Sequence, residues 1–178
     1  MGQPLPIHQF MYQIFPGNKG FIFLEILIAV AITSLVFLVL LSIGIQSMLL
    51  SQSIERSTKI DSLLREELEA VRSFRDGSVW ANSGLGSLNT GSSNPYYPVL
   101  DTSVNPARWT LQAGTQTIGE YTRKIIFDKV SRNPSTGQIE DTYNITNDDP
   151  DTRKATASVV DGAKTYEVVT YFTNWQTN

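Results

Sequence analysis

The residues that most enzymes use for covalent or acid–base chemistry are nearly missing from this 178-residue chain. It contains no cysteine, which excludes disulfides, cysteine-ligated zinc and thiol catalysis. Its single histidine, His8, stands in the N-terminal tail, so a Ser-His-Asp triad would have to draw on that tail. The sequence holds no P-loop and no glycine-rich dinucleotide motif. We therefore expect no enzymatic activity and no cofactor.

One group of acidic residues has the composition of a cation site. Asp148, Asp149 and Asp151 stand close together in the stretch NDDPD, and oxygen-rich loops can bind calcium. Their spacing is not that of an EF-hand, and an acidic turn solvated by water accounts for the same residues. The three aspartates are a weak candidate metal site, and the solvated turn is the favoured interpretation.

A single carboxylate interrupts a long apolar segment. From Phe21 to Ile45 nearly every residue is apolar, and only Glu25 carries a charge. A carboxylate at the centre of a membrane helix costs roughly 2.5–3.5 kcal/mol, so its presence requires an explanation. Glu25 either lies solvated at the level of the lipid headgroups or pairs with a positive charge in apolar surroundings.

The apolar segment has the length of a membrane span. As a helix, residues 21–45 would extend roughly 37 Å at about 1.5 Å per residue, and a bilayer core is about 30 Å thick. A cleaved secretory signal fits less well, because the segment is long and no small-residue cleavage site follows it. The net charge of -3 gives no broad basic surface, so we expect no nucleic-acid binding.

Helical periodicity continues beyond the apolar segment, over residues 46–76. Apolar residues recur there at spacings of three and four: Ile60, Leu63, Leu64, Leu68, Val71 and Phe74. This spacing predicts an amphipathic helix that covers a sheet. No proline occurs between Phe21 and Asp76, so we expect one helix over residues 21–76, with Gly77 as its C-terminal cap.

The remainder, residues 77–178, reads as a globular head. Residues 77–106 are rich in Gly, Ser, Asn and Pro, which predicts a long irregular connection that Trp80, Tyr96 and Tyr97 pin to the head. Strands are expected within 107–175, at 107–112, 121–130, 153–160 and 164–173, and Asp161-Gly162 predicts a hairpin between the last two. A helix followed by such strands indicates an α+β fold, with a long N-terminal helix packed on a small antiparallel β-sheet.

The stretch Lys19-Gly20-Phe21-Ile22-Phe23-Leu24-Glu25 resembles the cleavage region of type IV prepilins and pseudopilins. That family has a polar leader ending in Gly, then Phe, then Glu at the fifth mature position, then a long apolar run. The resemblance implies that prepilin peptidase cuts between Gly20 and Phe21 and methylates the new Phe21 amine. It also implies that Glu25 meets the N-terminal amine of a neighbouring subunit during assembly.

The resemblance carries a set of expected partners and locations. The partners are other pilin or pseudopilin subunits, prepilin peptidase, an inner-membrane assembly platform, and membrane lipid before assembly. The chain would first span the cytoplasmic membrane once with its head outside, and would then enter a cell-surface or periplasm-spanning filament. The leader, residues 1–20, is long for the family, and a start at Met11 would give a more typical one.

The C-terminal stretch DDPDTRKATASVV, with the strand that ends in TYFTNW, is similar in layout to the last hairpin of minor pilins of the PilV and pseudopilin I types. The sequence therefore favours a structural subunit, and a minor one, of a pilus-like or type II secretion-like filament. The alternative is a membrane-tethered extracytoplasmic binding protein that is never cleaved.

Overall fold

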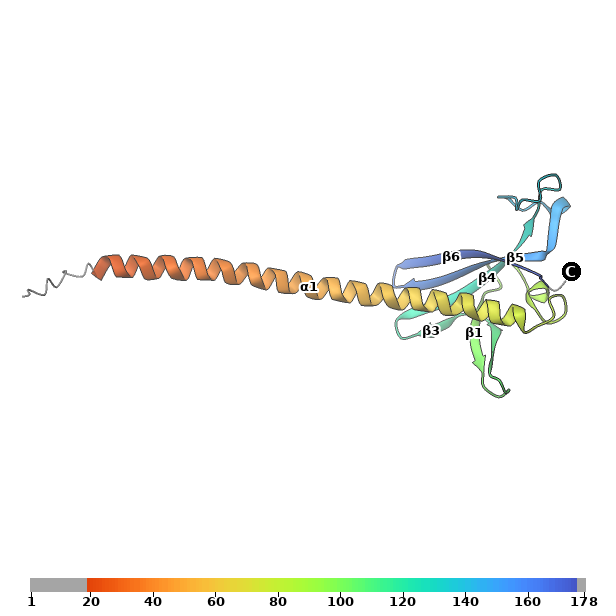
Figure 1. Ribbon diagram of the computed structural model, residues 1–178, viewed down its shortest axis with the longest axis horizontal. Helices are drawn as coiled ribbons and strands as arrows, with labels where there is room; N and C mark the ends of the chain where they lie inside the picture. The colour runs from red at the N-terminus through yellow and green to blue at the C-terminus, as the bar shows by residue number, and fades with distance from the viewer. Residues whose placement is uncertain (1–18, 176–178) are drawn as a thin grey trace, which may run out of the picture. The chain divides into compact units, whose positions relative to one another are not determined.

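The computed structural model describes residues 19–175 (Figure 1). The chain divides into two compact units, Met1–Gln52 and Ser53–Asn178, which are considered separately below. The expected leader, residues 1–20, lies outside the described residues apart from its last two. Helix α1 (Lys19–Asp76) contributes to both units and contains every described residue of the first.

Helix α1 confirms the helix expected over residues 21–76 and begins two residues earlier. It contains no proline, and it ends where the N–H of Gly77 donates to the carbonyl oxygen of Ser73 at 3.0 Å. The change from apolar to amphipathic sequence was expected after residue 45, whereas the compact unit of the head begins at Ser53. Residues 21–59 of the helix are exposed, and Ile60 is the first buried residue after them.

The head contains six strands in one sheet, and all described pairs are antiparallel. The strands are β1 (Tyr96–Asp101), β2 (Arg108–Ala113), β3 (Gln116–Ile118), β4 (Tyr121–Ser131), β5 (Asp148–Asp161) and β6 (Lys164–Thr173). Their order is β2-β1-β4-β5-β6, and β3 pairs with β4. Two short 3₁₀ helices, η1 (Leu85–Ser87) and η2 (Ile145–Asn147), lie in the connections. The α+β fold with a long helix on an antiparallel sheet is thereby confirmed.

Most of the expected strands lie where the sequence placed them. Strand β6 and its hairpin with β5 are confirmed, and a two-residue turn at Gly162 joins them, with Gly162 at φ 58°. Strand β5 begins at Asp148 rather than Arg153. A register shift after Lys129 explains the extra residues, because it brings Val130 and Ser131 opposite Asp149 and Asp148.

The sequence predicted an irregular connection over residues 77–106. This prediction is wrong for Tyr96–Asp101, which form strand β1. Two prolines, Pro95 and Pro98, and the nearby glycines concealed this strand in the sequence. The structure shows why Pro98 is tolerated: beyond Tyr96, which pairs with Ile125 of β4, strand β1 has a partner on one side only. A missing N–H on the free side of a strand costs no ladder hydrogen bond.

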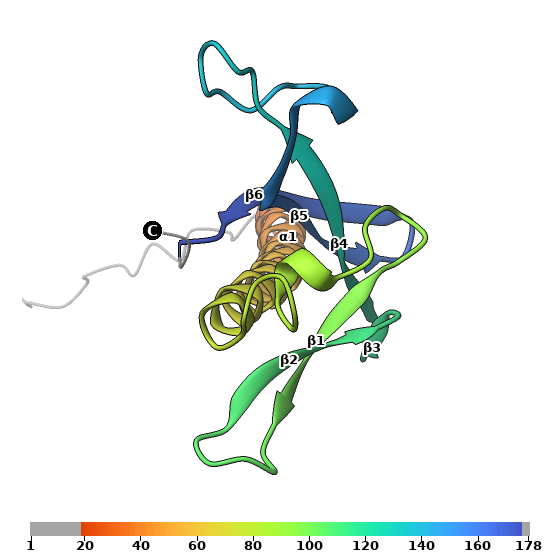
Figure 2. The same ribbon diagram turned by 90° about the vertical axis from the view of Figure 1, so that its right-hand side faces the viewer.

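The core lies between the helix and the inner face of the sheet, in two clusters. One joins Val71 to Trp80, Leu85, Tyr96, Ile125, Phe127, Ala155 and Phe172. The other joins Ile60, Leu63 and Leu64 to Tyr121, Ala157 and Val159. Figure 2 shows the helix against one face of the sheet, with the β1–β2 hairpin and the segment 132–147 extending from opposite sides of the head. The predicted stripe is confirmed, although Leu68 and Phe74 are only partly buried.

The connection after the helix is held by Trp80, as the sequence suggested. Its ring is 6% exposed, and Nε1 donates to the carbonyl oxygen of Pro150 at 3.0 Å. Gly86 packs directly on this ring, where a Cβ atom would come within 2.6 Å of it. Tyr96 is also buried, whereas Tyr97 is half-buried and its hydroxyl donates to Gln112. Trp80 and Tyr96 therefore serve packing, and Tyr97 braces the β1–β2 hairpin.

Truncation of Leu64 tests the helix–sheet contact. We predict that residues 53–178, produced without the apolar segment, fold as a soluble monomer. Leu64 is 7% exposed, so Leu64→Ala should lower the free energy of unfolding of this fragment by roughly 2–5 kcal/mol, since it leaves a cavity in the core. Urea denaturation followed by circular dichroism measures the change.

The matched control is Ser62→Ala, since Ser62 is an exposed residue of the same helix. It should change the free energy of unfolding by no more than about 0.5 kcal/mol. Equal effects of the two substitutions would contradict the burial of the stripe.

Candidate functional site

The first unit exposes an apolar helical surface on all sides. Every side chain from Phe21 to Gln52 is exposed, with Phe21 at 72% and Leu50 at 62%. Nothing else in the described part of this unit covers it. This is the one described helix long and apolar enough to cross a membrane, which by itself is weak evidence for an anchor. An apolar surface of this extent requires lipid or protein around it.

The hydroxyl groups on this helix are satisfied within the helix itself. Thr33, Ser34 and Ser42 each donate to the carbonyl oxygen four residues earlier, at 2.7, 2.7 and 3.0 Å. Polar side chains that bond back to their own helix expose no unpaired donor to apolar surroundings. All polar side chains of the apolar segment except one are thus compatible with burial in lipid or protein.

Glu25 is that exception. It is exposed, and within the described residues it makes no hydrogen bond or ion pair. Phe21 precedes it by one helical turn, so the two residues share a face of α1. The Gly20–Phe21 bond lies in the first turn of α1, where backbone N–H groups have no intrahelical acceptor. A new amine at Phe21 would therefore stand one turn from Glu25.

The three aspartates proposed as a metal site are engaged separately. The carboxylate of Asp148 accepts from the hydroxyl of Tyr143 at 3.0 Å. That of Asp149 accepts from Arg132 Nε at 2.5 Å, and that of Asp151 accepts from Asn174 at 3.0 Å. Among the described residues, no group of three acidic or histidine side chains could hold a metal ion. The structure therefore does not bring these residues together as a cation site.

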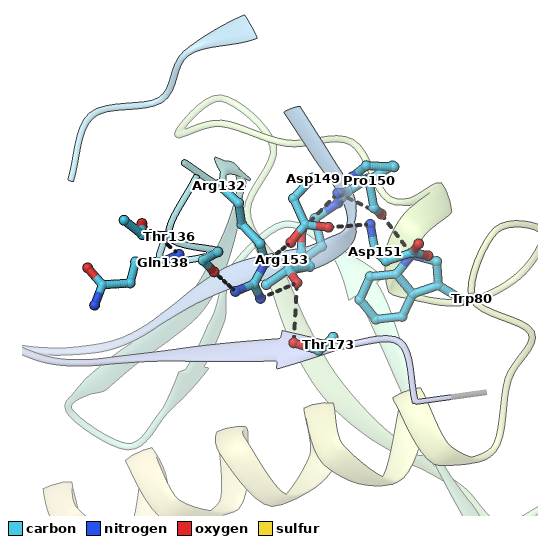
Figure 3. A network of polar contacts seen from close by, with 11 residues as sticks. Trp80, Arg132, Thr136, Gln138, Asp149, Pro150, Asp151, Arg153 and Thr173 are labelled. Atoms are coloured by element: carbon cyan, nitrogen blue, oxygen red, sulfur yellow. Dashed lines mark hydrogen bonds and ion pairs between the residues drawn. The ribbon is translucent and has the colours of Figure 1, made fainter. Parts of the chain in front are cut away.

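Asp149 and Asp151 belong instead to a network of polar contacts at the start of β5 (Figure 3). Arg132 donates to Asp149, to the carbonyl oxygen of Gly137 at 3.0 Å and to the hydroxyl of Thr152 at 3.2 Å. Burial opposes the ionisation of Asp149, but hydrogen bonds from Arg132, Thr152 and the Asp151 N–H together lower its pKa. The network ties segment 132–147 to the sheet.

A cavity of about 370 Å³, with several charged residues in its lining, opens on the sheet face that points away from the helix. Asp128, Lys154 and Tyr171 lie side by side across β4, β5 and β6 and form part of its lining. Segment 132–147 contributes Glu140, Asp141 and Tyr143 to its wall. Lys154 and Asp128 approach each other at 3.8 Å, so part of the charge is neutralised internally.

The most unusual ionisable group of the head is one that sequence analysis missed. Glu67 of α1 is fully buried, and neither carboxylate oxygen has a hydrogen-bond partner among the described residues. Burial raises its pKa from the ordinary 4.5 to about 8, the nearby positive charge of Arg123 lowers it, and the negative charge of Glu66 adds to the increase. A signal was present in the sequence: positions 60, 63, 64, 67, 70 and 71 follow helical spacing, and Glu67 stands in the middle of them.

Arg123, on strand β4, is the residue whose positive charge lowers the pKa of Glu67. Its side chain is 4% exposed, and it donates from Nη1 to Glu66 at 2.9 Å and from Nε to Gln116 at 2.9 Å. This contact links α1 to β4 and to the short strand β3. Arg123 thus forms an ion pair with the more exposed of two adjacent glutamates, while the buried one has none.

In comparisons with known proteins, no family model, no curated protein and no solved structure matches this chain.

Glu67 makes the stability of the head depend on pH. The folded state holds the Glu67 proton between pH 4.5 and about 8, whereas the unfolded state releases it above 4.5. Because the unfolded state binds fewer protons in this range, the free energy of unfolding should fall as the pH rises, by up to about 1.4 kcal/mol per pH unit. Denaturation of residues 53–178 at several pH values measures the slope.

Glu67→Gln provides the control, since it keeps the shape of the protonated side chain and cannot ionise. This variant should lose the decline between pH 5 and 8 and should exceed the wild type in stability at pH 8. If the free energy of unfolding changes with pH equally in the wild type and the variant, the Glu67 carboxyl is exposed to water and the prediction is wrong.

Proposed function

We propose that this chain is a structural subunit of a filament of the type IV pilus or type II secretion kind. Its apolar helix would be inserted in the cytoplasmic membrane, cut by prepilin peptidase between Gly20 and Phe21, and then packed against the helices of other subunits. The observation that carries the proposal is Glu25, a lone unpaired carboxylate on an exposed apolar helix, one turn from the residue that cleavage would make N-terminal.

The chemistry of this position supports a pairing role. A carboxylate in apolar surroundings is stabilised only when a positive charge and hydrogen-bond donors accompany it. An amine at Phe21 of the same chain, or of a neighbour, would provide both. The self-satisfied hydroxyls of Thr33, Ser34 and Ser42 leave Glu25 as the one described group on residues 21–45 that needs an external partner. Pairing with a neighbour would also set the axial position of each helix in a bundle.

The second candidate is a membrane-tethered binding protein that keeps its leader. The cavity on the outer sheet face favours it, because a pocket of this size with charged residues in its lining could hold a small ligand that carries polar groups. The two candidates differ at the mature N-terminus. Intact-mass analysis of the protein from membranes should find a chain that begins at methylated Phe21. An intact leader would favour the tether.

Gly20 provides the processing test. A bulky side chain on that side of the cut should block the peptidase, so Gly20→Trp should accumulate in the membrane at full length. Gly17→Trp, three residues upstream, is the matched control and should still be trimmed. Mass analysis of both variants shows whether the leader has been removed from each. Normal trimming of Gly20→Trp would mean that the cut lies elsewhere.

Glu25 provides the assembly test. Glu25→Leu removes a charge that is costly in the membrane, so insertion should be as good as in the wild type or better. Cleavage should persist, because Gly20 and Phe21 are unchanged. Assembly should fail or become inefficient, because a buried ammonium without its partner costs about 3–5 kcal/mol. Filament counts by electron microscopy, together with the amount of subunit in sheared filaments, measure the defect.

Glu25→Asp keeps the charge but has a shorter side chain, so its assembly should be less efficient than that of the wild type and more efficient than that of Glu25→Leu. For a minor subunit the defect should be fewer filaments, not altered ones. Wild-type filament numbers and wild-type incorporation of Glu25→Leu would exclude the charge pair, and Glu25 would then be a carboxylate solvated at the membrane surface.

A further inference from the structure

The buried carboxyl of Glu67 lies in the one part of the head where apolar contacts alone would be expected. It is fully buried on the helix stripe, with Leu63 and Leu64 one turn before it and Ala70 and Val71 one turn after it. Neither of its oxygens accepts a hydrogen bond among the described residues. A neutral carboxyl can be accommodated there, but an isolated carboxylate cannot, so ionisation must be accompanied by a rearrangement.

The charged groups around Glu67 determine what that rearrangement can be. The charges that act on it are those of Arg123, from β4, and Glu66, from its own helix. The inner face of β5 presents Ala155, Ala157 and Val159. The other titratable groups of the inward-facing rows are Tyr96 on β1, Tyr121 on β4, Arg153 and Asp161 on β5, and Lys164 and Tyr166 on β6. Arg153 donates from its Nη atoms to backbone carbonyls, including that of Gly86, and its buried Nε has no partner among the described residues. The positive charge that acts on Glu67 is that of Arg123, so Arg123 is the available cation.

Arg123 pairs with the glutamate that can do without it. Nη1 donates to Glu66 and Nε donates to Gln116. The two glutamates differ in what they lose without Arg123. The side chain of Glu66 is 40% exposed and can be hydrated, whereas Glu67 is enclosed. An ionised Glu67 consequently gains more from the guanidinium than Glu66 loses.

We propose that Glu66 and Glu67 are alternative partners of Arg123, selected by the protonation of Glu67. With Glu67 neutral, Arg123 holds Glu66 and the helix stripe is closed. When Glu67 releases its proton to water, the guanidinium moves to Glu67 and Glu66 becomes free and hydrated. The contact between α1, β4 and β3 thus has two arrangements, and the exposed charge of the helix at Glu66 depends on pH.

The experiment uses the full chain in detergent micelles, with ¹³C-labelled glutamate carboxyls and ¹⁵N-labelled arginine side chains, titrated by NMR from pH 5 to 10. One carboxyl signal, absent in Glu67→Gln, should titrate well above the others. The Nε signal of Arg123 should move with the same midpoint in the wild type and stay fixed in Glu67→Gln. An Arg123 signal that does not follow Glu67 would overturn the exchange.

Glu66→Gln tests the competition directly. Without the competing carboxylate, Arg123 is free for Glu67, so the midpoint of Glu67 should fall by at least one pH unit, a tenfold change in its ionisation constant. Glu69→Gln is the matched control, because Glu69 lies three residues further along α1 and pairs with the exposed Arg72. In Glu69→Gln, the titration midpoint of Glu67 should equal the midpoint in the wild type. Equal midpoints in both variants would overturn the proposal, and the comparison of wild type with Glu67→Gln remains decisive if Glu66→Gln does not fold.

Discussion

The head of this protein depends on one contact, the burial of a narrow stripe of helix α1 against the inner face of the sheet. Ile60, Leu63, Leu64 and Val71 meet residues of β4 and β5 there, and the two core clusters are built on them. The small residues Ala155 and Ala157 of β5 are fully buried on this face, and the large rings of Phe127 and Phe172 are buried in the cluster around Val71. Because the stripe is only two or three residues wide, the same helix can present charged side chains on its remaining faces, as in the exposed pairs Asp61–Arg65 and Glu69–Arg72.

Polar groups are treated differently in the two units. On the apolar helix, hydroxyl groups bond to their own backbone, so they make no demand on the surroundings. In the head, polar side chains hold loops to the sheet. Arg132 ties segment 132–147 to β5, and Arg153 reaches the backbone near η1. Trp80 donates to the carbonyl oxygen of Pro150, and Trp175 donates to the carboxylate of Asp76.

Two carboxyl groups are the exceptions, Glu25 on the apolar helix and Glu67 in the core. Each lies where a charge is unfavourable and has no hydrogen-bond partner in the described residues. Their circumstances differ in a way that matters for function. Glu25 is exposed and so can meet a group from another molecule, which is the basis of the proposed filament subunit. Glu67 is enclosed, and the cation it can reach belongs to the same head. Glu25 supports the proposal about filament assembly, and Glu67 supports the proposal that a contact in the head depends on pH.

The amino-acid sequence by itself determined the helix, the β5–β6 hairpin and the α+β class. These follow from local signals: the absence of proline over 21–76, apolar spacing of three and four, and a glycine that can adopt positive φ at the turn. The sequence also singled out Glu25, because a charge within an apolar run is visible without a fold. The tertiary structure alone decided the rest. Strand β1 exists because β2 pairs with it, which no local propensity around Pro98 reveals. The three aspartates of NDDPD each accept a hydrogen bond from a different side chain, and two of these donors, Arg132 and Asn174, are distant in the sequence and reach them only after folding. Helical spacing puts Glu67 among the apolar positions of the helix, but only the sheet packed over it makes it a buried acid with a raised pKa.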